Sequence, residues 1–259
     1  MVFKLLGTGA GIGVPSFFCN CTACIEAKGD PKWRRSRSSA LIDTGKELVL
    51  IDASPDLRSQ LIRERISKID CIFMTHWHYD HFAGLGELEY YVRLEKKEPI
   101  PLFLPLSAER EFRLAFPFLE DVYAVDFWCY GQAHTFSELK ITPLPAVHGT
   151  QTAGFICEGT KRLAYFPDTA RLSSDVAKEL RGVDYWIGDA TFNGRNWMEH
   201  SHMNIEQMIE QGHEIDAVQI IPTHMSMHYD TPITSKKLLA AFKSHKNVTL
   251  SYDGMVIEI

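Results

Sequence analysis

Residues 75–81 carry four metal-binding side chains in one short segment. It reads Thr-His-Trp-His-Tyr-Asp-His, and the candidate ligands are His76, His78, Asp80 and His81. Imidazole suits zinc, iron and manganese, whereas carboxylates suit harder cations. Catalytic metals are held by several protein ligands with one position left open for water or substrate. The segment therefore predicts chemistry that depends on bound metal.

Three further candidate ligands lie downstream, and each follows a segment expected to be a strand. They are His148, Asp168 and His224. One loop histidine carries little information, but three metal-binding residues at strand ends, after the cluster at 76–81, predict a shared site. The seven candidates exceed the four ligands that one structural zinc ion uses, so the sequence favours two metal ions.

Three cysteines, Cys19, Cys21 and Cys24, are bunched near the N-terminus. The sequence shows no export signal, and bunched cysteines in such a chain more often bind metal or do redox chemistry than form disulfides. A tetrahedral zinc site would need a fourth ligand. We expect a cysteine-zinc loop at about 7–32, and the alternative is three buried, reduced cysteines.

The hydrophobic pattern predicts the elements that position these residues. Apolar runs rich in β-branched residues predict strands at 2–6, 40–43, 48–51, 71–74, 101–104, 139–144, 153–157, 163–166, 185–188, 217–222, 248–252 and 255–259. Helical spacing and capping residues, including a capping box of Asn204 with Gln207, predict helices at 55–65, 107–115, 173–180, 205–211 and 234–244. Interspersed strands and helices favour packed sheets with helices outside. No linker divides the chain, so we expect one α/β domain over 1–259.

Composition narrows the class of protein. A chain of 259 residues can bury one large core, and 23% charged residues is ordinary for a globular domain. The net charge of -6 argues against a surface that tracks nucleic acid. No apolar run reaches the roughly 18 residues of a membrane span. We expect a cytoplasmic protein without a membrane or nucleic-acid partner.

The metal-binding residues resemble the pattern of the metallo-β-lactamase superfamily, His-x-His-x-Asp-His followed by His, Asp and His. The resemblance covers nearly the whole chain. It implies an αββα sandwich, in which two mixed β-sheets carry helices on both outer faces. It also implies two divalent metal ions, zinc or manganese, with ligands His76, His78 and His148 for one, Asp80, His81 and His224 for the other, and Asp168 bridging them.

Within the superfamily, the opening of the chain is similar to the PhnP-type cyclic phosphodiesterases. The shared segments are 6–9, 13–15, the three cysteines and 37–42. That family places a structural zinc on three such cysteines and on a histidine shortly after the last catalytic one. The matching residue here is His228, although it lies four positions after His224 where the family spacing is three.

The same family carries a histidine that protonates the leaving group. His202 matches it, because Met-Asn-Ile-Glu-Gln follows, and His200 is the alternative. The resemblance thus implies catalytic roles for Asp80, Asp168 and His202. A short basic run contains Lys32, Arg34, Arg35 and Arg37. Arg37 and His200 are candidate substrate-binding residues, since arginine pairs with phosphate oxygens. A solvated loop is the other interpretation of that run.

The resemblance implies hydrolysis of a small cyclic phosphodiester by hydroxide held between two metals. The substrate would be a phosphoribosyl 1,2-cyclic phosphate from phosphonate breakdown or a 2',3'-cyclic nucleotide, and the enzyme a homodimer. Alternatives on the same fold are a tRNase Z-like RNA 3'-processing nuclease, a lactone or thioester hydrolase, and a di-iron redox protein. The sequence lacks the long Gly- and Pro-rich arm of tRNase Z, and the redox branch has glutamate where His78 stands.

Overall fold

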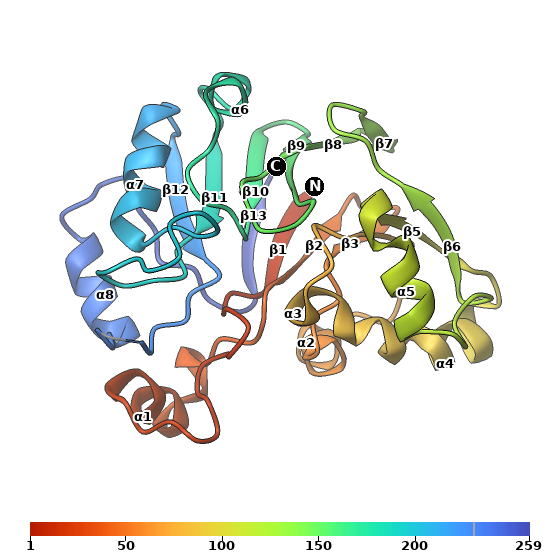
Figure 1. Cartoon of the computed structure of the whole chain (residues 1–259), viewed down its shortest axis with the longest axis horizontal. Coiled ribbons are helices and arrows are strands. Elements are labelled where there is room, and N and C mark those ends of the chain that lie inside the picture. The colour runs from red at the N-terminus through yellow and green to blue at the C-terminus, as the bar shows by residue number, and fades with distance from the viewer. Residues whose placement is uncertain (230) are drawn as a thin grey trace.

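Two mixed β-sheets form the centre of the computed structural model, which describes residues 1–229 and 231–259 (Figure 1). The first sheet has the order β13 (Met255–Glu258), β1 (Val2–Gly7), β2 (Ser39–Asp43), β3 (Leu48–Ile51), β4 (Cys71–Phe73), β5 (Ile100–Leu104) and β6 (Tyr123–Phe127). The second has the order β12 (Gln219–Thr223), β11 (Tyr185–Asp189), β10 (Arg162–Phe166), β9 (Ala153–Glu158), β8 (Leu139–Pro145) and β7 (His134–Phe136).

Each sheet combines an antiparallel half with a parallel half. In the first sheet β13, β1, β2 and β3 pair antiparallel, and β3 to β6 pair parallel. In the second sheet β7 to β10 pair antiparallel, and β10 to β12 pair parallel. Parallel neighbours end at the same sheet edge, so the loops after β10, β11 and β12 emerge together.

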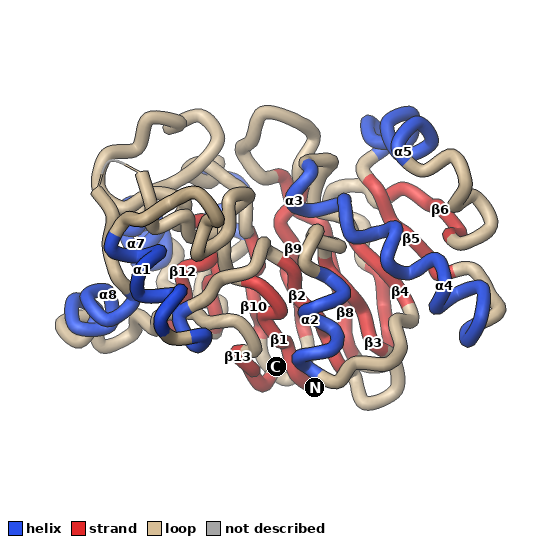
Figure 2. The backbone as a smooth tube through the Cα atoms, turned by 90° about the horizontal axis from the view of Figure 1, so that it is seen from below, coloured by secondary structure: helices blue, strands red, loops and turns tan. Residues whose placement is uncertain are grey.

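Successive side chains along a strand point to opposite faces of its sheet, so the buried residues form one central core between the sheets and two outer cores. Phe3 and Leu5 of β1 pack with Tyr165 of β10 between the sheets, whereas Leu6 and Phe166 face the outer layers. This is the period of two expected for strands buried on both faces. The helices cover those outer faces, with α7 and α8 on the second sheet and α2 and α5 on the first (Figure 2).

The helical layers contain short segments and contribute no membrane span. The α-helices are α1 (Thr22–Gly29), α2 (Leu57–Glu64), α3 (Tyr79–Phe82), α4 (Glu89–Tyr91), α5 (Glu109–Ala115), α6 (Ser174–Glu179), α7 (Ile205–Glu214) and α8 (Ser235–Phe242). Further turns are the 3-10 helices η1 (Pro31–Trp33), η2 (Ala83–Leu88) and η4 (Leu106–Ala108) and the π-helix η3 (Val92–Lys96). Among the described residues, no helix is long and apolar enough to cross a bilayer.

The αββα architecture confirms the predicted fold class, but several elements differ from the sequence prediction. The predicted strand at 248–252 is a loop with a single bridge, between Val248 and Ile220. Its apolar residues are buried because Val248 and Leu250 join the core beneath α8, not because they pair in a sheet. The prediction also missed β6 and β7, which are partly exposed strands at the sheet edges, and α1, in which buried and exposed residues are mixed.

Candidate metal centre

Two loops at the edge of the sandwich bring together His76, His78 and His148. His76 Nε2 lies 2.8 Å from His78 Nδ1, which lies 3.1 Å from His148 Nε2. The far nitrogens of two rings are engaged elsewhere. His76 Nδ1 lies 2.9 Å from Thr75 Oγ1, and His148 Nδ1 donates to the Ser201 carbonyl at 2.9 Å. One nitrogen of each imidazole therefore faces a common point, as in a metal site with oriented ligands.

Asp80, His81, Asp168 and His224 form a second group whose polar atoms lie within 4.8 Å of one another. His81 Nε2 is 2.7 Å from Asp168 Oδ2, and His224 Nε2 is 3.4 Å from Asp80 Oδ2. Asp168 Oδ2 also lies 3.4 Å from His76 Nε2 in the first group. The structure thus places the Asp168 carboxylate between the two groups.

The electrostatics and hydrogen bonding of the second group fit cations. His81 Nε2 and Asp168 Oδ1 are buried, and among the described residues neither makes a hydrogen bond of normal geometry, although charged or polar neighbours lie within 3.1 Å of each. Burial opposes charge on His81, but the carboxylates of Asp80, Asp52 and Asp168 outweigh it and raise the pKa of His81 well above its usual range. Buried carboxylates around open imidazole nitrogens are a donor set for a zinc- or manganese-like ion.

In the first group, two of the rings, those of His76 and His78, are kept neutral. Burial, with the neighbouring charge of His81, lowers the pKa of His76 well below its ordinary value. Burial, with the charge of His148, also lowers the pKa of His78. A neutral imidazole keeps a lone pair, which is the form that binds a metal ion.

Local structure explains how these loops are held. His78 is the N-cap residue of α3, so Asp80 and His81 fall in the first turn of that helix. Trp77 points to the other side, where its ring stacks on Phe82 at 4.1 Å. Successive side chains of the loop therefore alternate between the metal-binding groups and an aromatic contact that holds the loop to the helix.

Two backbone features bring other segments close to the same place. His224 follows β12 with φ of 53°, a left-handed conformation that is unusual for a residue other than glycine and that often marks a functional site. The N-terminal loop passes close to Asp80, and a Cβ added at Gly11 would lie 3.0 Å from Asp80 Oδ2. A side chain at Gly11 would crowd the carboxylate.

Two buried aspartates that sequence analysis missed orient the histidines. Asp52 Oδ2 lies 2.8 Å from His81 Nδ1, and its other oxygen accepts from the Thr75 backbone N–H at 2.7 Å. Asp189 Oδ2 lies 2.7 Å from His202 Nδ1. Asp52 follows β3 and Asp189 ends β11, so their only sequence signal was a polar residue at the end of an apolar strand.

His202 lies beside the second group, in a cleft of about 400 Å³. The capping box of α7, formed by Asn204 and Gln207, holds the chain that leads into this helix. Burial lowers the pKa of His202, but the Asp189 carboxylate outweighs burial and raises it to about 9. Since Nδ1 faces Asp189, Nε2 is the nitrogen left for a ligand in the cleft.

The predicted substrate-binding residues lie elsewhere. His200 is exposed, and Arg37 pairs with both carboxylate oxygens of Asp56 at 2.9 and 3.0 Å. Neither is among the residues that line the cleft. The cleft wall next to His202 is aromatic instead, with Phe192 and Tyr229 ring centroids 5.5 Å apart.

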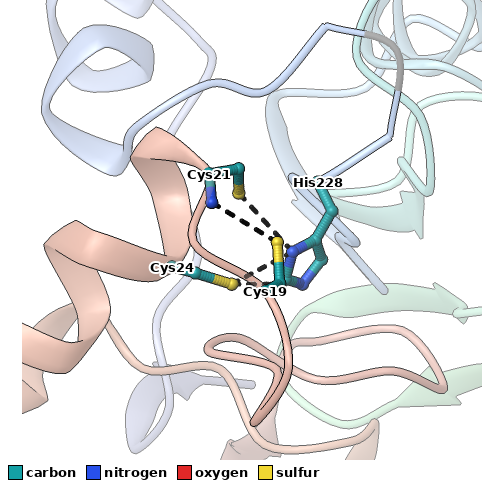
Figure 3. A group of neighbouring side chains, drawn as sticks. All are labelled: Cys19, Cys21, Cys24 and His228. Carbon is teal, nitrogen blue, oxygen red and sulfur yellow. Dashed lines mark hydrogen bonds between the residues drawn. The ribbon is translucent and has the colours of Figure 1, made fainter.

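A separate group joins Cys19, Cys21, Cys24 and His228, with ligand atoms within 4.8 Å of one another (Figure 3). His228 Nδ1 lies 3.1 Å from Cys24 Sγ and 3.7 Å from Cys21 Sγ. Its Nε2 donates to the Gly13 carbonyl at 2.8 Å, which leaves the Nδ1 lone pair toward the thiols. A hydrogen bond from the Cys21 backbone, then His228, lower the pKa of Cys19 to about 6. Three sulfurs and one imidazole nitrogen fit tetrahedral zinc.

Comparisons with known proteins find a family model, relatives of different names and similar solved structures. Residues 47–225 match the family described as the β-lactamase superfamily domain. Coenzyme PQQ synthesis protein B of Methylobacterium nodulans is 28% identical, over 98% of this chain and 99% of that protein. Octanoyltransferase of Porphyromonas gingivalis is 43% identical over 86% of this chain, which spans only 46% of that protein. The crystal structure of a new diphosphatase from the PhnP family superimposes with a TM-score of 0.87 at 26% identity, covering 100% of this chain and 97% of that one.

Proposed function

Since this chain belongs to the metallo-β-lactamase superfamily of metal-dependent hydrolases, we propose that it hydrolyses a small cyclic phosphodiester. The observation that carries the proposal is His202, a partly buried histidine charged by Asp189 and placed at the cleft beside Asp168. A thioester has less need of a strong proton donor, because it expels a thiolate. An alkoxide leaving a phosphodiester needs one.

The proposed ligand sets are those that the structure brings together. His76, His78 and His148 would hold one divalent cation, and Asp80, His81 and His224 a second, with Asp168 shared. When bound, such a pair of cations supplies water of lowered pKa and neutralises charge on the phosphate oxygens. The third group, Cys19, Cys21, Cys24 and His228, would hold a structural zinc that ties the N-terminal loop to the loop after β12.

The chain's own side chains would perform the proton transfer. Water attack forms a new P–O bond while the ring P–O bond to the sugar breaks. His202 donates its Nε2 proton to the departing oxygen, and Asp189 holds the ring through Nδ1 and stabilises the charged form before transfer. Asp52 likewise holds the His81 ring through Nδ1, which leaves His81 Nε2 facing Asp168 in the second group.

The cleft wall favours a cyclic nucleotide over a bare phosphoribose. Phe192 and Tyr229 line the cleft, and Trp197 packs against both rings, with centroids at 4.9 and 5.4 Å. An aromatic wall can stack a nucleobase, a contact worth about 1–3 kcal/mol per base. Tyr229→Ala should therefore raise KM for 2',3'-cyclic AMP and leave KM for phosphoribosyl 1,2-cyclic phosphate unchanged.

A second candidate is hydrolysis of an acyl thioester or ester. It is favoured by the relative named octanoyltransferase, although this chain spans less than half of it. A panel on the metal-loaded enzyme separates the two candidates. It contains 2',3'-cyclic AMP, phosphoribosyl 1,2-cyclic phosphate, a nucleoside diphosphate ester, an octanoyl thioester and a lactone. Faster turnover of the thioester or lactone than of every phosphate ester would refute the proposal.

A further inference from the structure

A second cavity, of about 620 Å³, lies between η1, α8 and the segment 248–252. It shares no lining residue with the cleft at the candidate metal centre. Its volume is within the range of roughly 300–1,000 Å³ that small-molecule sites occupy. Part of the basic run singled out in the sequence, which the proposed function does not use, forms one side of it.

The walls of this cavity are apolar, and they are formed by α8 on one side and by the segment 248–252 on the other. Leu239 and Phe242 contribute one face of α8, and Val248 and Leu250 contribute the loop opposite. Trp33 of η1 completes the wall. Leu239 keeps 42% of its surface exposed, whereas its helix neighbours Leu238 and Phe242 are buried. A ligand with a hydrocarbon body would remove this exposed surface from water.

The floor of the cavity carries a buried arginine side chain that has no directly paired carboxylate in the part of the chain that the structure describes. Arg35 lines the cavity and is 3% exposed, and no carboxylate of the described residues forms an ion pair with it. Its Nη1 donates to Thr8 Oγ1 at 2.8 Å and to Ser251 Oγ at 3.3 Å, and its Nε donates to the sulfur of Met227 at 3.1 Å. Asp253 is reached only through the Thr8 hydroxyl.

The charged side chains that line the rim are all positive, and the Glu26 carboxylate lies behind the lining residue Ser235. Lys32, Arg34 and Lys243 line the cavity, and its described lining includes no aspartate or glutamate. The Lys32 ammonium lies 4.4 Å above the ring of Trp33, at the boundary between charged rim and apolar wall. The N-terminus of α8 does not contribute, because Glu26 already accepts from the backbone N–H groups of Ser235 and Lys236.

We propose that this cavity binds a small amphipathic carboxylate, with its apolar body against the wall and its carboxylate toward Arg35 and the basic rim. Because Nε and Nη1 of Arg35 already donate to Met227, Thr8 and Ser251, Nη2 is the nitrogen left to donate to a carboxylate oxygen, and the charge of the guanidinium strengthens that hydrogen bond. Inorganic phosphate is not the proposed ligand, because it has no apolar part to place against Leu239 and Phe242. The site is independent of the metal centre, so ligand binding does not require turnover.

The test is calorimetric titration of the metal-loaded full chain with sodium octanoate as the probe and octanamide as its neutral analogue. Arg35 bonds three separate segments, and its substitution would disturb the fold, so the variants are placed at the wall and rim. Leu239→Trp fills the cavity. Lys243→Glu reverses a charge on the rim, and Lys237→Glu makes the same change on α8 at a residue outside the cavity.

Octanoate should bind the wild type and Lys237→Glu equally. Lys243→Glu should weaken binding by about threefold to tenfold, because one attraction becomes a repulsion near the protein surface. Leu239→Trp and the use of octanamide should each weaken it by about tenfold or more. The proposal is overturned if octanoate does not bind, if octanamide binds as tightly, or if binding is the same in all variants, as it would be for octanoate held at the metal centre.

Discussion

Replacing Asp189 by asparagine should move the pH dependence of catalysis without removing a side chain from the cleft. Asp189 Oδ2 lies 2.7 Å from His202 Nδ1, and its charge is the main influence that raises the pKa of His202 against burial, to about 9. Asparagine keeps the volume and removes the charge. The pKa of His202 should then fall to its ordinary value of about 6.5 or below.

The size of the effect follows from these two pKa values. At pH 7.5 a group with a pKa of about 9 is roughly 97% protonated, whereas one with a pKa of about 6.5 is roughly 9% protonated. A general acid works only in its protonated form, so kcat/KM at pH 7.5 should fall about tenfold. The loss should shrink as the pH is lowered toward 6. The alkaline limb of the profile should therefore move to lower pH in Asp189→Asn.

The assay is kcat/KM for 2',3'-cyclic AMP between pH 5.5 and 10, with the metal content of both proteins matched. Asp189 also accepts from the backbone N–H groups of Thr169 at 3.1 Å and Thr191 at 2.8 Å, so thermal unfolding of the variant must be measured in parallel. A purely structural role would lower activity by the same factor at every pH. An unshifted alkaline limb would refute the assignment of His202 as the acid charged by Asp189.

Three further outcomes test the other parts of the site. His202→Ala should lower kcat/KM for the cyclic nucleotide by about 10²- to 10⁴-fold and affect bis(p-nitrophenyl) phosphate much less, because nitrophenolate leaves without a proton. The control His200→Ala, at an exposed residue, should leave kcat/KM unchanged for both substrates. Equal losses on both substrates in His202→Ala would contradict the role of His202 as the acid. Asp168→Ala should abolish turnover and lower the metal content measured by elemental analysis. Unchanged turnover and unchanged metal content in this variant would rule out Asp168 as a ligand shared by two cations. Cys24→Ser should lose one zinc per chain and about 3 kcal/mol of stability or more in thermal unfolding, whereas the exposed Cys129→Ser should lose neither.

The candidate metal-binding residues were predictable from the sequence because their information is local. His76, His78, Asp80 and His81 lie within one turn-forming segment, and metal-binding chemistry is evident from their residue types alone. The strands that precede His148, Asp168 and His224 were also predictable, because burial on both faces requires continuous apolar runs. Strand ends that share a sheet edge then bring distant residues together.

The roles of residues that act through their charge or packing are determined by the tertiary structure alone. Asp52 and Asp189 resemble any polar residue after a strand, and only the fold places each beside a histidine. The basic run near the N-terminus likewise separates in space, with Arg37 held by Asp56 and Arg35 buried at the floor of another cavity. Residue type and spacing therefore determine which atoms can bind a metal. The surrounding charges, which set the pKa of each group, come from segments far apart in the chain and exist only after folding.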